Sequence, residues 1–127
     1  MCLYRLRLAN GNFSMNIFYA LLIGLGSTYA LWIFFLAVMS LARAKDAGLL
    51  TATAKVLGYP VLIVGYLLDC FVNVFVMTFV FLEIPQETTV TARLSRHYDE
   101  SSGWRKAIAD WAAPLLNPYD PSGKHLK

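Results

Sequence analysis

Charged side chains are scarce in this chain of 127 residues, and their distribution is uneven. They make up 15% of the sequence, whereas 57% of the residues are hydrophobic. Residues 17–42 contain no charge, and residues 56–82 contain a single one, Asp69. Because a typical soluble domain carries about 25% charged residues, this composition excludes an ordinary soluble domain and indicates insertion into a membrane.

Cysteine and histidine are also sparse, and their positions predict no reactive centre. Cys2 lies near the N-terminus and Cys70 lies inside the second apolar stretch, while His97 and His125 both lie near the C-terminus. No spacing among them resembles a metal site, and neither histidine forms a recognisable pattern with an acid and a nucleophile. We therefore expect no metal, no cofactor and no enzymatic activity. A net charge of +3 is too small to predict a nucleic acid partner.

Both apolar stretches are long enough to cross a bilayer as helices. Residues 17–42 reach about 39 Å as a helix, against a hydrocarbon thickness of about 30 Å. A cleaved signal peptide is the alternative for this stretch, but the run is longer than such peptides use and lacks an evident cleavage site. The connection to residues 56–82 is short, with its turn near residues 46–48, which favours an antiparallel hairpin. The predicted fold is an all-α membrane protein: a two-helix transmembrane hairpin with a short amphipathic C-terminal helix.

The stretch before the hairpin differs in composition from the apolar spans. Residues 1–16 form either a short basic arm, with Arg5 and Arg7, or an extension upstream of a start at Met15. The hairpin itself occupies residues 17–82, with spans at about 17–42 and 56–82.

Residues 83–127 form a polar tail, whose first part is broken by Pro85 and is interpreted as a linker beside the membrane. A helix is predicted at about 102–116, with Ser101 or Ser102 as its N-cap. Its apolar residues share one face and suit either a membrane interface or a groove on a partner; packing on its own linker is the alternative. A type I turn is predicted at residues 120–123. The residues predicted to form the tail interface are Trp104, Arg105, Ile108, Trp111, Leu115, Tyr119 and Asp120.

Asp69 lies at the midpoint of the second span, where a carboxylate costs about 2.5–3.5 kcal/mol and normally faces protein or water. It shares a helical stripe with Gly65 and Asn73. The midpoint of the first span lies near Tyr29, so an antiparallel hairpin brings the small and hydroxyl residues before it to the same level. We therefore predict that Asp69 accepts a hydrogen bond from Ser27 or Thr28, in its own hairpin or in a neighbouring copy. The predicted helix-packing or pore-facing residues are Asp69, Asn73, Gly65, Gly24, Ser27 and Thr28.

Three roles for Asp69 remain open at this point. It can hold helices together by hydrogen bonding, it can line a pore or lesion formed on oligomerisation, or it can relay protons or ions. The third role normally needs a chain of titratable groups, and neither span contains a second one.

The tail sequences TARLSRH and GWRKAIADWAAPLLNPYDPSGKH resemble the C-terminus of small inner-membrane proteins encoded in phages and prophages of proteobacteria. Those proteins look like two-span hairpins with a tail of the form T-x-R…G-W-R…L-L-x-P-[FY]-D-P-S-G-x-H. The family often has Cys after the histidine, whereas this chain has Leu126, which removes support for a terminal thiol or lipid role. The resemblance implies the hairpin layout, and no established function comes with it. The matching positions are Thr91, Arg93, Gly103, Trp104, Arg105, Leu115, Leu116, Pro118, Tyr119, Asp120, Pro121, Ser122, Gly123 and His125.

Basic residues on the two sides of the hairpin predict its orientation. The connection carries Arg43, Lys45 and Lys55, whereas the sides of both termini together carry more Lys and Arg. The positive-inside rule therefore places both termini in the cytoplasm.

The expected function is that of a non-enzymatic integral protein of the bacterial inner membrane, of phage or prophage type. It would act as an anchor or scaffold through helix association and through partner binding by its tail. The alternative is a holin-like lesion former that acts in host lysis. The expected partners are the lipid bilayer and either further copies of the chain or a phage or host membrane protein; no nucleic acid is expected.

Overall fold

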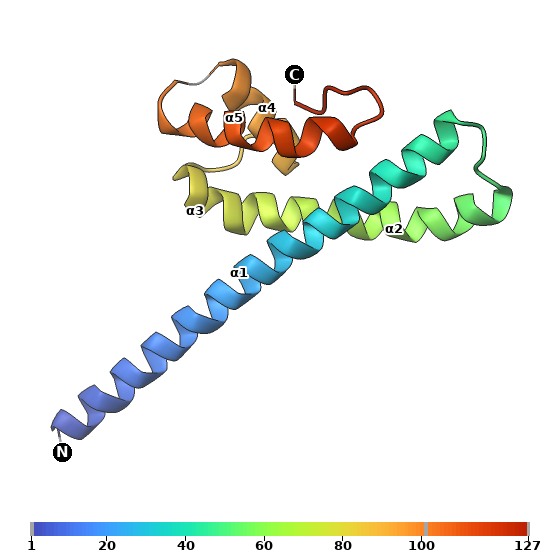
Figure 1. Cartoon of the computed structure of the whole chain (residues 1–127). Helices are drawn as coiled ribbons and strands as arrows, with labels where there is room; N and C mark the ends of the chain where they lie inside the picture. Colours follow the sequence, from blue (N-terminus) through green and yellow to red (C-terminus); the bar gives the residue numbers. More distant parts are fainter. Residues whose placement is uncertain (1, 101, 127) are drawn as a thin grey trace.

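A computed structural model of the chain describes residues 2–100 and 102–126, with side chains described from Phe13 onward. The described residues contain helices and no strand, which confirms the predicted all-α class (Figure 1). The helices, in chain order, are α1 (Cys2–Asp46), α2 (Ala52–Phe71), the π-helical turn η1 (Val72–Val76), α3 (Met77–Phe81), α4 (Val90–Asp99), α5 (Trp104–Leu116) and the 3₁₀ turn η2 (Asn117–Tyr119).

Two long antiparallel helices form the hairpin. The first candidate span is Phe13–Asp46, and the second is Ala52–Phe81, which runs without a break through α2, η1 and α3. Their lengths of 34 and 30 residues and mean hydropathies of 2.0 and 2.1 are sufficient to cross a membrane. The predicted two-helix hairpin is therefore confirmed. The backbone of residues 2–16, the predicted N-terminal arm, continues α1, whereas Met1 lies outside the described residues.

Two glycines set the contact between the spans. A Cβ atom on Gly58 would lie 3.2 Å from Cδ1 of Leu41, and one on Gly65 would lie 3.4 Å from Cδ1 of Phe34. Each large side chain of α1 therefore packs directly on the backbone of α2. The step from Phe34 to Leu41 on α1 corresponds to the step from Gly65 back to Gly58 on α2, so the two helices pair residue for residue in opposite directions. The same register places Asp69 opposite Ala30, one residue from the midpoint of the first span estimated from the sequence.

Replacing Gly65 by leucine is expected to push α1 and α2 apart and to destabilise the hairpin by about 1–3 kcal/mol, because the added side chain overlaps Phe34. Unfolding of the detergent-solubilised protein, titrated with a denaturing detergent, measures the change. Gly26→Leu is the matched control, since a Cβ at Gly26 meets nothing within 4 Å. Equal losses for the two variants would contradict a specific contact at Gly65.

The tail contains a helix that the sequence analysis did not predict. The stretch interpreted as a linker holds α4, which begins after Thr89. The Thr89 hydroxyl accepts a hydrogen bond of 3.3 Å from the N–H of Ala92, which caps the helix. The buried face of α4 carries Val90, Arg93, Leu94 and His97.

Helix α5 packs through alanines rather than through its aromatic residues. Ala109, Ala112 and Ala113 are buried, whereas Trp104 and Trp111 are 49% and 69% exposed. The predicted amphipathic face is therefore largely uncovered, and a second, smaller face packs on the rest of the chain. The predicted serine cap is also wrong for Ser102, because Gly103 precedes the helix without a side-chain cap; Ser101 lies outside the described residues.

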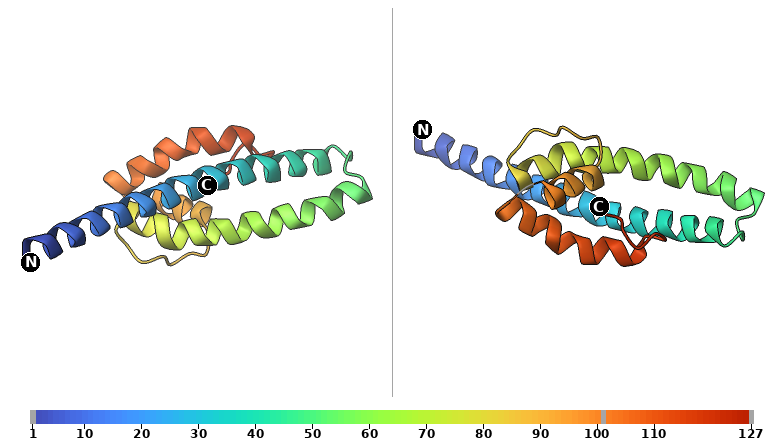
Figure 2. Two further views of the ribbon diagram at one scale, coloured as in Figure 1. Left: turned by 90° about the horizontal axis from the view of Figure 1, so that it is seen from below. Right: turned by 90° about the horizontal axis from the view of Figure 1, so that it is seen from above.

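The tail folds back along the hairpin instead of hanging free. The two views of Figure 2 place α5 beside α1, with α4 between α5 and α3. At one end of α5 the ring of Trp104 stacks at 6.4 Å on Phe81, the last residue of α3. Beyond its other end, Arg43 of α1 donates hydrogen bonds to the carbonyls of Pro118 and Tyr119, at 3.0 and 2.8 Å. The contacts therefore extend over most of the length of the hairpin.

Candidate functional site

The carboxylate of Glu83, just after the end of the second span, contacts four basic side chains of α4 and α5. Its Oε1 lies 3.3 Å from Nε of Arg93, 2.5 Å from Nη2 of Arg96 and 2.8 Å from Nε2 of His97. Its Oε2 lies 3.4 Å from Nη1 of Arg105 in α5. The side chains of Arg93 and His97 are almost entirely buried. Glu83 therefore links α4 and α5 to the hairpin through one clamp, called here the Glu83 clamp.

The Glu83 clamp is an ion-pair device rather than a proton-transfer site. Burial opposes the charged form of Glu83, but hydrogen bonds from Arg96, His97 and Arg93 outweigh it and lower the pKa from 4.5 to about 2. Glu83 is therefore ionised throughout the neutral range. Glu87 adds a second pair with Arg96 beside it.

Acidification is expected to release the tail between about pH 4.5 and pH 2. Because the pKa of Glu83 is lower in the folded chain, the clamp contributes its full stability above pH 4.5 and loses it as Glu83 is protonated. Hydrogen exchange of α4 in detergent as a function of pH measures the release. In the Glu83→Gln variant the Glu83 part of this transition should be absent; an unchanged transition would assign it to other carboxylates.

Asn73 receives the buried guanidinium of Arg93. Nη1 of Arg93 donates to the backbone carbonyl of Asn73 at 2.9 Å and to its Oδ1 at 3.3 Å, and Nδ2 of Asn73 donates to the carbonyl of Glu87 at 2.5 Å. Asn73 lies in the π-helical turn, where Met77 N–H donates to Val72, and such turns are frequent at functional sites. Asn73 therefore binds the tail of its own chain.

Asp69 is the second anchor point of the tail. Its Oδ1 accepts a hydrogen bond of 2.8 Å from the N–H of Val90, the first residue of α4. A carboxylate at this position also interacts favourably with the helix dipole. The prediction of a bond from Ser27 or Thr28 is wrong within the chain, because both hydroxyls donate to the carbonyl of Gly24, at 3.0 and 2.8 Å. Serine and threonine inside helices commonly bond back to the preceding turn in this way.

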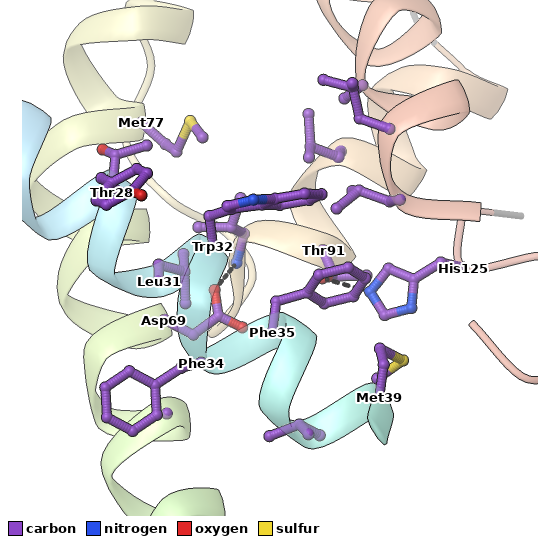
Figure 3. Close-up of a pocket in the computed structure, with 18 of the residues that line it drawn as sticks. Thr28, Leu31, Trp32, Phe34, Phe35, Met39, Asp69, Met77, Thr91 and His125 are labelled. Carbon is purple, nitrogen blue, oxygen red and sulfur yellow. Dashed lines mark hydrogen bonds between the residues drawn. The ribbon is translucent and has the colours of Figure 1, made fainter. Parts of the chain in front are cut away.

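An apolar groove of about 630 Å³ lies between α1, α2 and the tail (Figure 3). Most of its lining is aliphatic and aromatic, as at Trp32 and Phe35. Thr28 and Asp69 both line it, so the predicted polar level exists without the predicted bond. Of the two glycines predicted to pack the helices, Gly65 is in close contact with Phe34. Gly24 is not in close contact, because a Cβ there would lie 4.0 Å from Cγ2 of Val76. The polar residues at the groove are Thr28, Asp69, Thr91 and His125.

Thr91 of α4 meets Asp120 and His125 of the C-terminal segment beside this groove. Nδ1 of His125 lies 2.8 Å from Oδ2 of Asp120, and its Nε2 lies 3.1 Å from Oγ1 of Thr91. Hydrogen bonds from the Ser122 hydroxyl and from His125 lower the pKa of Asp120 to about 2. In the sequence these three residues are connected only by the resemblance to the phage and prophage proteins, whose tail motif contains Thr91, Asp120 and His125.

Hydroxyl, imidazole and carboxylate in this order also form hydrolase triads, which need free N–H donors for the developing oxyanion. Two N–H groups next to Thr91 are already used: that of Val90 donates to Asp69 and that of Ala92 donates to Thr89. The hydrogen bonds of this set tie the C-terminal segment to α4, and the set is called here the pin. The predicted turn that carries Asp120 forms, with a bond of 2.9 Å from Gly123 N–H to the carbonyl of Asp120.

The predicted tail-interface residues divide between the two sides of α5. Arg105 faces inward, where it donates to the carbonyl of Phe81 at 3.0 Å, and Asp120 belongs to the pin. Ile108 is half-buried against the cluster of buried apolar residues that includes Leu94 and Ala112. Four residues remain 40–69% exposed: Trp104, Trp111, Leu115 and Tyr119. Trp111 and Leu115 also border the groove, and the ring of Tyr119 contacts that of Trp32 at 5.5 Å.

Comparison with known proteins gives no match: neither a family model, nor a curated protein, nor a solved structure corresponds to this chain. The features of the chain that bear on its function are therefore the Glu83 clamp, the Asp69–Val90 hydrogen bond and the exposed face of α5.

Proposed function

We propose that the chain is a non-enzymatic integral membrane protein that anchors or scaffolds a partner at the bacterial inner membrane. The observation that carries this proposal is the Glu83 clamp, in which one carboxylate binds two arginines and a histidine of α4 and one arginine of α5. A tail held in this way has a fixed orientation relative to the hairpin. It can therefore present a preformed surface, which lowers the entropic cost of binding.

The surface available to a partner is the exposed face of α5, which borders the groove at Trp111 and Leu115. Trp111 is 69% exposed, and Trp104 and Leu115 lie on the same side of the helix. Aromatic side chains of this kind dominate the energetics of protein interfaces. Their lack of charge favours a partner that is itself in or at the membrane: a phage or host membrane protein, or a second copy of the chain.

The phage or prophage type and the orientation in the membrane are supported by the sequence. Assignment to a phage or prophage inner-membrane protein follows from the resemblance at residues 91–125. The distribution of Lys and Arg supports a cytoplasmic location for the ends of the two spans at Phe13 and Phe81.

A holin-like lesion former is the alternative, and it requires a polar face that is open to water across the whole membrane. In this chain Asp69 and Asn73 are occupied by Val90, Glu87 and Arg93 of the tail. This occupation favours the anchor, because lesion formation would first have to release the tail.

Expression of the full chain in bacteria with a membrane-potential dye separates the two functions. The anchor predicts an unchanged potential, together with a discrete crosslinked product when a photoreactive residue replaces Trp111. The same photoreactive residue at Ile63, which is exposed on the second span, is the matched control and should not give that product. Prompt depolarisation without any other phage product would overturn the proposal.

A further inference from the structure

The segment between α3 and α4 turns back along the second span. Nδ2 of Asn73 binds the carbonyl of Glu87 at 2.5 Å, and Asp69 binds the N–H of Val90 at 2.8 Å. Asp69 precedes Phe81, the end of α3, by twelve residues, which is about 18 Å along a helix. Half of the hydrocarbon layer is about 15 Å thick. When Phe81 lies at the membrane boundary, α4 therefore begins near the depth of the bilayer centre.

This segment is unsuited to contact with lipid. Residues 82–89 are not helical. Leu82 and Ile84, next to the end of the span, are 74% and 82% exposed, whereas the exposed residues beyond Pro85 are the polar Gln86 and Thr88. In hydrocarbon each unsatisfied backbone group costs several kcal/mol, so non-helical backbone occurs at this depth only where protein buries it or water reaches it. The chain itself leaves its outer side uncovered.

The exposed edge of α4 continues the same polar surface. Asp99 and Glu100 are exposed, and Arg96 retains 22% of its side-chain exposure beside Glu87. Together with the preceding segment they form a polar flank, defined here as Gln86, Glu87, Thr88, Arg96, Asp99 and Glu100. On α5, Lys106 lies next to this edge, because its Nζ donates to the carbonyl of Tyr98 at 2.6 Å, and it pairs with the exposed Asp110. The outer side of α2 at the level of Asp69 is apolar, and Leu67 there is 61% exposed.

We infer that the polar flank borders a water-filled inlet, which runs from the membrane surface at Phe81 to about the depth of Asp69. The outward faces of the two spans contact lipid. The inlet is blind, because Asn73 is fully buried at its side and the Asp69–Val90 hydrogen bond closes its inner end. This inference rests on the membrane insertion in the proposed function, and it adds an aqueous surface along a segment that the sequence predicts to be a linker beside the membrane.

Cysteine accessibility tests the inlet in the full chain, reconstituted in phospholipid vesicles after Cys2→Ala and Cys70→Ala. A membrane-impermeant charged maleimide is supplied on both sides. Thr88→Cys is expected to react at nearly the rate of Leu49→Cys in the exposed connection. It should react at least about tenfold faster than Leu67→Cys, because the reactive thiolate forms only where water reaches the thiol.

Gln86→Cys provides a second position on the polar flank and should behave like Thr88→Cys. If both react as slowly as Leu67→Cys, lipid or another chain covers the flank and the inlet does not exist. If Leu67→Cys reacts as fast as Leu49→Cys, the second span is not in the bilayer and the proposed function itself fails. The two failures are therefore distinguishable.

Discussion

Replacement of Glu83 by glutamine is expected to release α4 and α5 from the end of the hairpin, at a cost of about 3–5 kcal/mol in docking free energy. Glutamine has nearly the same shape, but it carries no charge to balance the cations around it. Arg93 has no exposed side-chain surface, so its charge would remain buried with only the neutral acceptors of Asn73 and the Glu83 backbone. Loss of one partner of a buried pair is costly for this reason.

Hydrogen exchange of α4 and α5 in detergent measures this release, with α1 as an internal reference. Asp110→Asn is the matched control, because it removes a pair with Lys106 in which both side chains are at least 40% exposed. Such an exposed helical pair contributes only about 0.3–0.5 kcal/mol. Equal protection of α4 in the Glu83 variant and in the Asp110 variant would show that the clamp does not hold the tail.

The two spans could be predicted because they depend on a property that each residue carries by itself. An uncharged run longer than the hydrocarbon thickness is apolar wherever the chain folds, and the two candidate spans follow these runs. Helix α4 could not be predicted in this way, because two residues on its inner face, Arg93 and His97, look like solvated positions. Arg93 can be buried because Glu83 balances its charge, and His97 because the same carboxylate lies 2.8 Å from its Nε2; both contacts arise from the tertiary fold.

The orientation of α5 and the partner of Asp69 were missed for related reasons. The buried face of α5 consists of Ala109, Ala112 and Ala113, whose small side chains give a weak hydrophobic signal beside two tryptophans. Matching the span midpoints placed Asp69 at the right height on the hairpin, but a hairpin considered alone omits the tail. The N–H of Val90 is a competitor that appears only when residues 82–89 turn back.

Replacement of Asp69 by leucine is expected to change two measurements in opposite directions. Insertion of the second span should become more favourable by about 2.5–3.5 kcal/mol, because a carboxylate is removed from the middle of an apolar helix. Docking of α4 should weaken by about 1–3 kcal/mol, because the N–H of Val90 loses its acceptor. A role in membrane insertion alone predicts the first change without the second.

Asp69→Asn is the control that separates charge from hydrogen bonding, since its amide oxygen can still accept from Val90. We expect the asparagine variant to retain the hydrogen-exchange protection at the start of α4 and the leucine variant to lose it. If leucine retains this protection, Asp69 does not hold the tail. If leucine instead abolishes crosslinked oligomers while α4 stays docked, the carboxylate acts between copies of the chain. Loss of docking alone identifies Asp69 as the residue through which the second span positions its own tail.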